Sequence, residues 1–357
     1  MKKTISFVGS VGIPARYGGF ETLVEELSKQ LQHHYNIKVF CSKAVYSKPE
    51  RISGNKTLSY YYIPFKANGV QSIFYDAISF RKALKSSDII ILLGGGAGVF
   101  LYLSQLIYRK KKILFHPDGL EWKRKKWNWF TNRYLRYSIQ LLCRIADSIV
   151  IDNKALLPYY RQFSAKLEFC TYGGNQFELS DIPTDNEDYW LTIARAEPEN
   201  NLEMIAQSFL GRPTEHWKLI SNYSQTSYGQ KLYERFGNVE NIQFLQADYS
   251  KVFLEKHLNA CKGYIHGHSA GGTNPTLTAA MWLNKPLLCH RNEFNLATTQ
   301  EAALFFCSAD ELLRHREKNP LPNTALTQKA KNIAIEEYQW SHISEKYSII
   351  IERLLKK

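Results

Sequence analysis

Short runs of apolar residues alternate along this chain with longer segments in which apolar residues recur at helical spacing. A run that is apolar at every position fits a strand buried on both faces, and an apolar stripe every three to four residues fits a helix packed on a sheet. The expected strands are 4–9, 37–41, 58–63, 88–93, 112–116, 148–152, 190–194, 217–221, 242–245, 263–266 and 286–290. The clearest expected helices are 20–33, 72–85, 127–145 and 334–355. Such strands alternating with helices predict an α/β protein built on parallel sheets.

Two successive α/β series divide the chain. A polar run, 175–188, separates them and is typical of a connector between domains. The length of 357 residues also favours two domains. We therefore expect an N-terminal domain over 1–172 and a C-terminal domain over 173–335.

The composition is that of a globular protein, with 44% hydrophobic residues. No uninterrupted apolar stretch approaches the roughly 18 residues that a transmembrane helix requires. The opening residues, MKKTISFVGSVG, predict a strand and a glycine loop, because their apolar run is too short for a signal peptide and no cleavage site follows. The six cysteines are scattered without a CxxC pair, so we expect reduced thiols of a cytoplasmic protein, and neither disulfides nor zinc ligands.

Positive charge is concentrated between residues 101 and 170. The whole chain carries a formal charge of +13, and this span holds fourteen Lys or Arg against five Asp or Glu. Its candidate membrane-contacting residues are a basic run and two tryptophans: Lys123, Arg124, Lys125, Lys126, Trp127 and Trp129. Cations interleaved with aromatic residues suit an anionic membrane surface. Nucleic acid is the competing partner, but no nucleic-acid-binding motif accompanies the patch, and a solvated basic face is the remaining interpretation.

The segment 264–281, YIHGHSAGGTNPTLTAAM, is the most informative stretch of the chain. It predicts a buried strand that ends in a loop of small and polar residues, which then opens a helix. Gly271 and Gly272 allow another group to approach the backbone closely. Thr273 or Asn274 can cap the helix, and Pro275 suits its first turn. A helix start of this kind can bind an anion, typically a phosphate, although a capped helix in any α/β protein is the alternative interpretation.

Five motifs occur in a fixed order along nearly the whole chain: GSVGIPARYGGFET at 9–22, DGLEWKR at 118–124, ARAEPENN at 194–201, the segment 264–281, and YQW at 338–340. Together they resemble the motifs of bacterial family 4 retaining glycosyltransferases, and specifically those of the polysaccharide rhamnosyltransferase subgroup. The resemblance implies the α/β fold called GT-B. This fold has two facing Rossmann-like domains with a cleft between them, and a C-terminal helix, here 336–357, that crosses back to the N-terminal domain.

The resemblance also implies where the phosphates of a donor bind. Gly18 and Gly19 precede a helix whose first amides can meet the distal phosphate, although a tight strand-to-helix turn explains them equally well locally. Arg195 can place its guanidinium on two phosphate oxygens and stabilise the departing diphosphate. Asn200 and Asn201 stand where the family commonly has a lysine, so Arg195 should matter more. The donor loop contributes His268, Gly271, Gly272, Thr273 and Asn274.

The catalytic candidates of the N-terminal domain follow the expected strand 112–116. Asp118 can bond sugar hydroxyls or the acceptor, and His116 is the second candidate. Both residues also fit structural roles, since Asp before Gly is a common turn. We expect no metal ion, because GT-B enzymes generally need none and the chain has no DxD motif. The pair His266 and His268 lacks further ligands at a workable spacing.

One departure from the family concerns the ribose of the nucleotide. Ala279 stands where a glutamate usually contacts the ribose, and alanine cannot bind hydroxyls. Either Thr276 or Thr278 substitutes for that glutamate, or the donor preference has changed, or the activity is reduced. Glu293 is a further candidate for a ribose or sugar contact.

The resemblance implies a retaining glycosyltransferase that moves L-rhamnose, or a related sugar, to a lipid-linked glycan in surface polysaccharide (O-antigen or capsule) synthesis. The implied donor is dTDP-L-rhamnose or a UDP-sugar, with no separate cofactor and no nucleic-acid partner. The implied location is the cytoplasm, in peripheral association with the anionic inner face of the cell membrane. Two alternatives are a GT-B transferase with a galactose-type or N-acetylated hexose donor, and a non-catalytic membrane-associated partner subunit.

Overall fold

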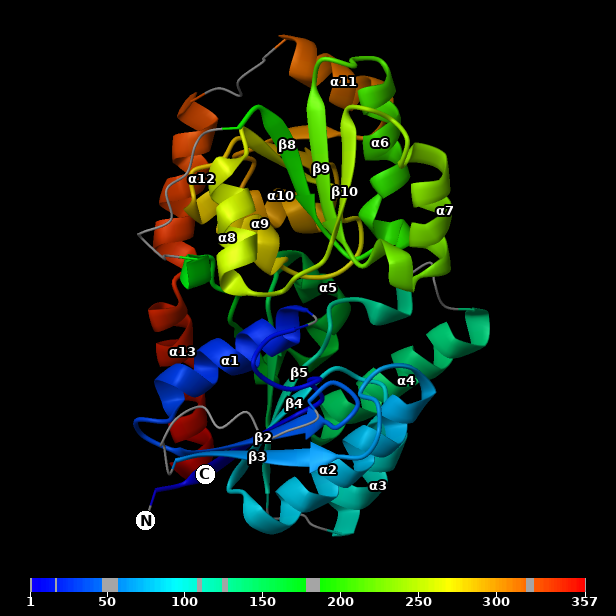
Figure 1. Ribbon diagram of the computed structural model, residues 1–357. Coiled ribbons are helices and arrows are strands. Elements are labelled where there is room, and N and C mark those ends of the chain that lie inside the picture. Colours follow the sequence, from blue (N-terminus) through cyan, green and yellow to red (C-terminus); the bar gives the residue numbers. More distant parts are fainter. Residues whose placement is uncertain are drawn as a thin grey trace. The chain divides into compact units, whose positions relative to one another are not determined.

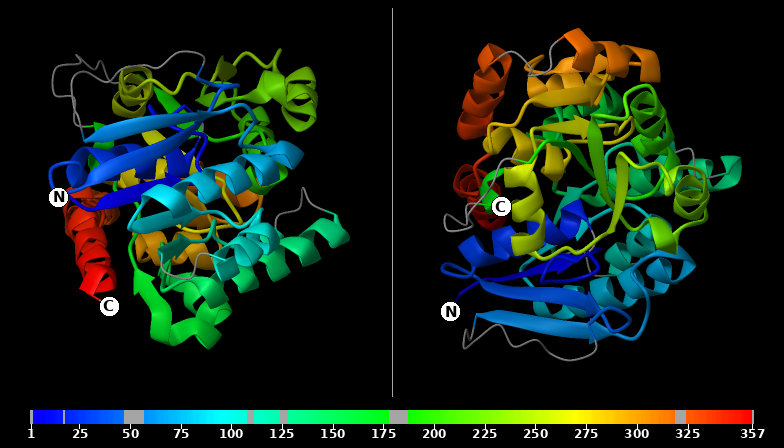
Figure 2. Two further views of the ribbon diagram at one scale, coloured as in Figure 1. Left: turned by 90° about the horizontal axis from the view of Figure 1, so that it is seen from below. Right: turned by 45° about the horizontal axis from the view of Figure 1, so that its top comes forward.

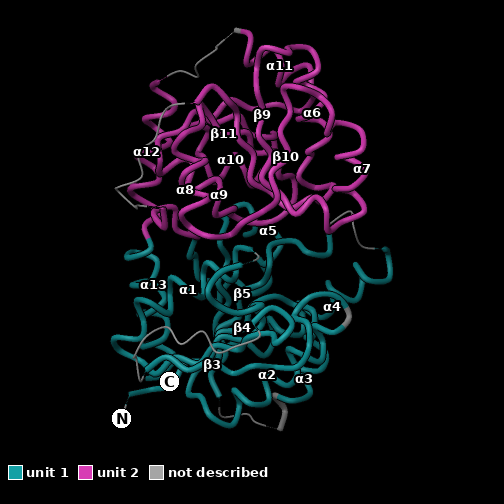
Figure 3. The backbone as a smooth tube through the Cα atoms, in the orientation of Figure 1, with its two compact units in different colours: residues 1–123, 127–171, 340–357 teal, residues 124–126, 172–339 magenta. Residues whose placement is uncertain are grey.

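The computed structural model describes residues 2–16, 18–46, 57–107, 111–123, 128–177, 187–318 and 324–356. These residues form two compact units (Figure 3). Within the described ranges, the first unit contains the chain up to residue 123, then 128–171 and the C-terminal segment from Trp340, and the second contains 172–339. Each unit is built on one parallel sheet of the Rossmann type, so the expected fold class of two Rossmann-like α/β domains is confirmed.

The first unit has a seven-stranded sheet in the order β3-β2-β1-β4-β5-β6-β7. Its strands are β1 (Thr4–Val8), β2 (Asn36–Ser42), β3 (Leu58–Ile63), β4 (Ile89–Leu93), β5 (Lys112–His116), β6 (Ser148–Ile151) and β7 (Leu167–Phe169). Strand β4, with the sequence IIILL, is buried at all five positions. Such uninterrupted apolar strands arise because both faces of the sheet are covered.

Helices cover both faces of this sheet (Figure 1). They are α1 (Gly19–Leu31), α2 (Ser72–Ser86), α3 (Gly98–Ile107), α4 (Trp129–Ile145), α5 (Leu157–Tyr160) and α13 (Trp340–Lys356), with the 3-10 turns η1 (Gly69–Gln71), η2 (Glu121–Lys123), η3 (Lys154–Leu156) and η4 (Arg161–Lys166). Helix α13 packs along α1 on one face, whereas α3 packs against α4 on the other (Figures 1 and 2). The last helix therefore returns to the first unit, as the resemblance implied.

The second unit has a six-stranded parallel sheet in the order β10-β9-β8-β11-β12-β13. Its strands are β8 (Tyr189–Ile193), β9 (His216–Ser221), β10 (Ile242–Gln246), β11 (Gly263–His266), β12 (Leu287–His290) and β13 (Leu304–Phe306). Its helices are α6 (Leu202–Leu210), α7 (Ser227–Phe236), α8 (Lys251–Ala260), α9 (Pro275–Trp282), α10 (Glu293–Thr299), α11 (Ala309–Lys318) and α12 (Thr324–Glu337), with the turns η5 (Asn175–Phe177), η6 (Pro198–Asn200) and η7 (Tyr223–Gln225).

Two apolar cores, one on each face of this sheet, hold the second unit together. Under α6, α7 and α11, Trp217 stacks on Phe209 with 5.7 Å between the ring centroids. Under α8, α9 and α12, the core includes Leu191, Leu277 and Met281, all fully buried. Burying a large apolar side chain contributes about 1.5–3 kcal/mol, so these two cores stabilise the edge of the sheet from which the loops emerge.

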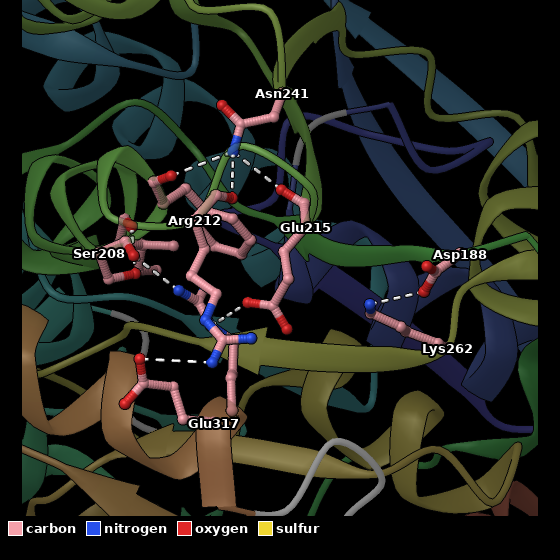
Figure 4. Close-up of polar contacts among 10 residues, drawn as sticks. Asp188, Ser208, Arg212, Glu215, Asn241, Lys262 and Glu317 are labelled. Atoms are coloured by element: carbon pink, nitrogen blue, oxygen red, sulfur yellow. Dashed lines mark hydrogen bonds and ion pairs between the residues drawn. The ribbon is translucent and has the colours of Figure 1, made fainter.

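Polar contacts secure the end of α6 (Figure 4). The side-chain amide of Asn241 donates to the carbonyls of Phe209, Arg212 and Glu215 at 3.0, 2.9 and 2.9 Å. The last carbonyls of a helix have no partner within the helix, and Asn241 supplies one. The buried Arg316 of α11 lies 3.6 Å from the ring centroid of Phe209 and 3.2 Å from the Glu215 carboxylate. Desolvation lowers the pKa of Arg316 to about 10, and Glu215 opposes that effect.

Two expected helices differ from the structure. Helix α4 begins at Trp129, because the side chain of Asn128 caps it and accepts a hydrogen bond from the amide of Thr131 at 2.9 Å, and the expected start at 127 lies outside the described residues. The expected helix 334–355 is interrupted and forms α12 and α13. The interruption falls at Tyr338, whose carbonyl accepts a hydrogen bond from the amide of Gly174 at 2.7 Å. Strands β7 and β13 were not expected, because runs of three residues carry too little periodicity to identify a strand.

Candidate functional site

The strand order of the second unit reverses between β8 and β11, which are neighbours in its sheet. In open parallel sheets, ligands bind outside the carboxyl ends of the strands at such a reversal, because the two adjacent loops diverge there. The loops concerned are 194–201, which contains Arg195, and 267–274, which contains His268. The topology therefore brings two of the sequence motifs to one edge of one sheet.

Asn200 holds these two loops together. Its side-chain N–H donates to the carbonyl of Arg195 at 2.7 Å, and its Oδ1 lies 2.8 Å from Nδ1 of His268. Because an amide oxygen only accepts, Nδ1 of His268 carries the hydrogen of this bond. Nε2 of the same ring lies beside Gly271, which has a φ of +126° and on which a Cβ would come within 3.0 Å of that nitrogen. Glycine is the residue that adopts this conformation readily.

The backbones of the two loops also pack directly against each other. Asn201 donates from its side chain to the carbonyl of Gly267 at 2.8 Å, and the amide and hydroxyl of Ser269 donate to the carbonyl of Glu199 at 2.8 and 2.9 Å. A Cβ on Gly267 would lie 2.1 Å from the carbonyl oxygen of Asn200, so only glycine permits this approach. Asn201 has a φ of 49°, a left-handed conformation that asparagine tolerates better than most residues.

Arg195 lies two residues beyond the end of β8, with 27% of its side chain exposed. Its Nη2 is 3.5 Å from Oε2 of Glu197 in the same loop. This carboxylate orients the guanidinium at the carboxyl edge of the sheet. A guanidinium presents paired N–H donors that match the oxygens of a phosphate.

Helix α9 begins directly after the second loop. Asn274 caps it, because Oδ1 accepts hydrogen bonds from the amide and the hydroxyl of Thr276 at 3.0 and 2.8 Å. Of the two expected capping residues, Asn274 is therefore the cap, while Thr273 is buried. Gly272, between Gly271 and Thr273, is partly exposed. An anion at this helix start is stabilised by the helix dipole.

The two threonines considered for the ribose differ in accessibility. Thr276 is partly exposed, and its hydroxyl is 2.8 Å from the hydroxyl of Tyr264. Thr278 is fully buried and donates to the carbonyl of Gly173 at 2.9 Å. Ala279 is also fully buried, inside the apolar core under α9. A ligand at this edge of the sheet can reach Thr276, whereas Thr278 and Ala279 face the protein interior.

Two further asparagines fix the backbone of His268. The side-chain amides of Asn292 and Asn295 both donate to its carbonyl at 2.9 Å. Asn292 also caps α10, and Glu293 at the first position of that helix is exposed. The sequence analysis missed the roles of Asn200 and Asn292. For Asn292 a signal existed, since an asparagine before a short amphipathic segment is a common helix cap.

The histidine at the end of β11 is held neutral. His266 is buried, and desolvation moves its pKa well below 6.5, with further lowering by His268 and His290. Among the residues that the structure describes, no group of three or more His, Cys, Asp or Glu is placed to hold a metal ion. The partly exposed His268 can offer a hydrogen bond to a ligand. Positive charge at the same edge of the sheet comes from Arg195.

The strand order of the first unit reverses between β1 and β4. The loop between β1 and α1 lies at this reversal, and Glu21 and Glu25 of α1 each accept a hydrogen bond from one of its backbone amides at 2.7 Å. Gly18 directly precedes α1, Gly19 is its first residue, and both are partly exposed. The loop is thus fixed by its own helix, and the two glycines lie where a ligand can reach the helix start.

His116 and Asp118 occupy different environments. His116 at the end of β5 is fully buried, with Nδ1 3.1 Å from the hydroxyl of Tyr347 and its ring packed edge-on to Phe20. Desolvation lowers the pKa of His116 to about 4, although the nearby Asp118 opposes that shift. His116 is therefore neutral near pH 7. Asp118 is partly exposed and is the more accessible of the two candidates.

Only part of the basic and aromatic patch lies within the residues that the structure describes. Lys123 is exposed at the end of η2, and Trp129 and Phe130, at 65% and 76% exposure, open α4. Their rings pack on each other with centroids 4.8 Å apart. The other expected membrane-contacting residues lie outside the described residues: Arg124, Lys125, Lys126 and Trp127. Within the described ranges, no helix is both long and apolar enough to span a bilayer.

Comparison with known proteins adds a family model and several solved structures. Residues 2–175 match a model described as a domain of unknown function, DUF1972. The curated proteins contain no significant sequence match. The whole chain is similar in structure to HepE of Anabaena, solved in complex with UDP, with a TM-score of 0.72, 13% identity, and coverage of 99% of this chain and 100% of that one.

Two further solved structures have the same arrangement. Sucrose-phosphate synthase of Thermosynechococcus elongatus gives a TM-score of 0.81 at 14% identity, covering 99% of this chain and 100% of its own. The catalytic domain of starch synthase IV of Arabidopsis thaliana, bound to ADP and acarbose, gives 0.71 at 11% identity and covers both chains fully. At these identities the likeness concerns the fold. The chain therefore has the α/β fold of the GT-B glycosyltransferases along its whole length.

Proposed function

We propose that this protein is a glycosyltransferase whose second unit binds a nucleoside-diphosphate sugar. The observation that carries the proposal is the Asn200 bridge, which fixes the Arg195 loop beside the His268 loop where the strand order reverses. A guanidinium and a capped helix start at the same edge suit a diphosphate. Two of the structures that share this fold contain UDP or ADP, which supports a nucleotide as the ligand.

The chemistry follows from the charge that develops on the leaving group. When the bond between C1 of the sugar and the phosphate oxygen breaks, the diphosphate gains negative charge, and the Arg195 guanidinium stabilises that charge. A new bond forms between C1 and the acceptor oxygen, and the acceptor proton passes to the departing phosphate, with retention of configuration. The resemblance of the motif 9–22 assigns Gly18 and Gly19 to the distal phosphate, and that of the motif 118–124 assigns Asp118 to sugar or acceptor hydroxyls. His116 supports the loop that contains Asp118 from the protein core, through the contact of its Nδ1 with the hydroxyl of Tyr347.

The motifs 9–22, 118–124 and 264–281 favour a specific donor and acceptor. On their resemblance to bacterial polysaccharide rhamnosyltransferases, the donor is dTDP-L-rhamnose or a UDP-sugar and the acceptor a lipid-linked glycan of O-antigen or capsule synthesis. The exposed Lys123, Trp129 and Phe130 support peripheral binding to an anionic inner membrane face.

One observation favours a second candidate, a transferase with a galactose-type or N-acetylated hexose donor. Ala279 stands where the family commonly has a ribose-binding glutamate, and it is fully buried. The nucleotide contacts of this chain therefore differ from the common pattern. The third hypothesis is a non-catalytic partner subunit. The presence of Arg195 and Gly271 at the positions of the donor-site motifs argues against it.

A calorimetric panel of nucleoside diphosphates, with UDP, dTDP, GDP and ADP measured in parallel, tests the proposal. We expect one base to bind at least about tenfold more tightly than the others, a difference of about 1.4 kcal/mol. The sugars of that nucleotide then define the donor panel for product formation. If none of the four nucleotides binds at millimolar concentration, the proposed function is wrong.

A further inference from the structure

The first unit contains a cavity of about 650 Å³ that the proposed donor site does not use. It lies between η2, the second half of α4, and the segment formed by α5 and η4. Its floor is apolar, because Ile139 and Cys143 of α4 are buried there. Its wall is aromatic, with Trp122 set edge-on to Tyr160 at 6.2 Å between ring centroids.

Three cations line this cavity: Lys123, Arg136 and Arg161. Lys123 is held in place, since its Nζ donates to the hydroxyl of Tyr159 at 2.8 Å and lies 4.3 Å from the centroid of that ring. The described lining residues include no carboxylate. Arg136 and Arg161 form no ion pair with any residue in the described part of the chain. Asp118, Glu121 and Asp152 interact electrostatically with the lining Tyr160, but they are not among the lining residues. The three cations of the lining favour an anionic ligand, and two guanidiniums suit the oxygens of a phosphate.

One face of α4 connects this cavity to the exposed aromatic residues. Trp129, Arg133, Arg136, Gln140 and Cys143 are spaced four, three, four and three residues apart, so they share one face of the helix. Arg133 lies 5.8 Å from the centroid of the Trp129 ring. Seven residues separate Arg136 from Trp129, which is about 10 Å along a helix. This matches the depth of about 5–10 Å to which interfacial residues enter the headgroup region of a bilayer.

We infer that this cavity binds the phosphomonoester or diphosphate headgroup of a membrane lipid. The phosphate lies between Arg136 and Arg161, and the apolar part of the lipid extends along α4 toward Trp129 and Phe130. A nucleic-acid strand would need a basic track longer than this one cavity. The inference adds a specific lipid site to the membrane association proposed above, and the site is distinct from the nucleotide site of the second unit.

Calorimetry with a soluble lipid tests the inference on the full chain. The probe is dihexanoyl phosphatidate below its micelle concentration, compared with dihexanoyl phosphatidylglycerol, inorganic phosphate and inorganic diphosphate. We expect the double variant Arg136→Gln/Arg161→Gln to bind phosphatidate about 25-fold less tightly, at about fivefold for each cation of about 1 kcal/mol. The matched control Arg81→Gln/Arg144→Gln removes the same charge from exposed residues of α2 and α4 outside the lining, and should bind as the parent does.

Three outcomes overturn the inference: no saturable phosphatidate binding by the parent, equal losses in the cavity and control variants, or inorganic phosphate or diphosphate bound as tightly as phosphatidate. The last result would assign the cavity to a small phosphorylated compound. Nucleoside diphosphate affinity is measured in every variant and should stay unchanged. A parent that binds nucleoside diphosphate but no phosphatidate therefore contradicts this inference alone, whereas a parent that binds no nucleotide contradicts the proposed function.

Discussion

Asn200 contributes more to the candidate site than its residue type suggests. It joins the Arg195 loop to His268, a residue 68 positions further along the chain, through both ends of one side-chain amide. With 6% of its surface exposed, Asn200 is more a part of the site's support than a ligand contact. A residue of this kind sets the distance between the guanidinium and the helix start, and hence the shape of the proposed diphosphate site.

Asn200→Ala should weaken nucleoside diphosphate binding about tenfold and lower the free energy of unfolding by about 1–3 kcal/mol. Two hydrogen bonds are lost, and the Arg195 carbonyl and the His268 ring must find other partners. Calorimetry and urea unfolding measure the two effects. The control Asn332→Ala removes an asparagine from an exposed position on α12. Nucleotide binding equal in both variants would show that Asn200 does not shape the site.

The residues with a local signature were predictable, and those defined by tertiary contact were not. Gly271 and Asn274 follow from a glycine loop that opens a helix, and Arg195 from its place after an apolar strand. The bridge by Asn200 depends on a contact between distant segments, which no local pattern encodes. Thr276 and Thr278 are equivalent in sequence terms, and only the packing of α9 distinguishes the partly exposed Thr276 from the buried Thr278.

Helix α9 is partly exposed at its start and buried further along. Its start lies at the loop edge and is capped by Asn274, whereas Leu277, Ala279 and Met281 lie in the core. A glutamate at Ala279 would therefore enter an apolar environment. Burial of an unpaired carboxylate raises its pKa, because desolvation disfavours the charged form.

Ala279→Glu should lower the free energy of unfolding by about 3–5 kcal/mol at neutral pH, the cost of an uncompensated buried charge. The folded-state pKa of the new carboxyl lies above its unfolded value, so the loss is small below the unfolded pKa, grows as pH rises from that value, and levels off above the folded-state pKa. Urea unfolding across this range, with the exposed Asn238→Glu as control, measures the effect. A well-folded variant with tighter nucleotide binding would instead mean that the helix turns to place this residue at the ribose.

At the level of elements, strands were predicted best because their signal is continuous. Strands β3, β5 and β11 have the expected bounds. Helix boundaries depend on single contacts, such as the cap at Asn128 or the Tyr338 carbonyl bonded to Gly174. The short strands β7 and β13 exist because neighbouring strands pair with them, which the sequence pattern does not reveal.

Each unit buries one neutral histidine at a strand end, so acid should destabilise both. The pKa of His116 is about 4 in the folded protein, below its ordinary value of 6.5, and that of His266 is also lowered. Below pH 6.5 the unfolded chain takes up protons that the folded chain excludes. The free energy of unfolding therefore falls as pH drops, by up to about 1.4 kcal/mol per pH unit for each histidine.

His116→Gln should flatten this dependence for the first unit between pH 6.5 and about 4. Thermal unfolding followed at several pH values measures it, with the exposed His34→Gln as the control that leaves the slope unchanged. A slope as steep in His116→Gln as in the parent would show that another group governs acid unfolding.

The whole molecule combines two sheets, each with its order reversed beside the first strand, and each places motif residues at that reversal. The fold follows from the alternation of apolar strands and helices. In the proposed function, stabilisation of the leaving group rests on Arg195, which is partly exposed and paired with Glu197. Substitution there should affect chemistry far more than folding.

The most direct test is sugar transfer by Arg195→Ala, with the nucleotide-sugar whose nucleotide binds best. The account predicts a turnover about 100- to 1,000-fold below that of the parent, the usual loss when one donor to the leaving-group charge is removed, with an unchanged unfolding midpoint. The control Arg235→Ala removes another arginine of the second unit that is paired with a glutamate, and should keep full activity. Turnover of Arg195→Ala within a few-fold of the parent would contradict the account.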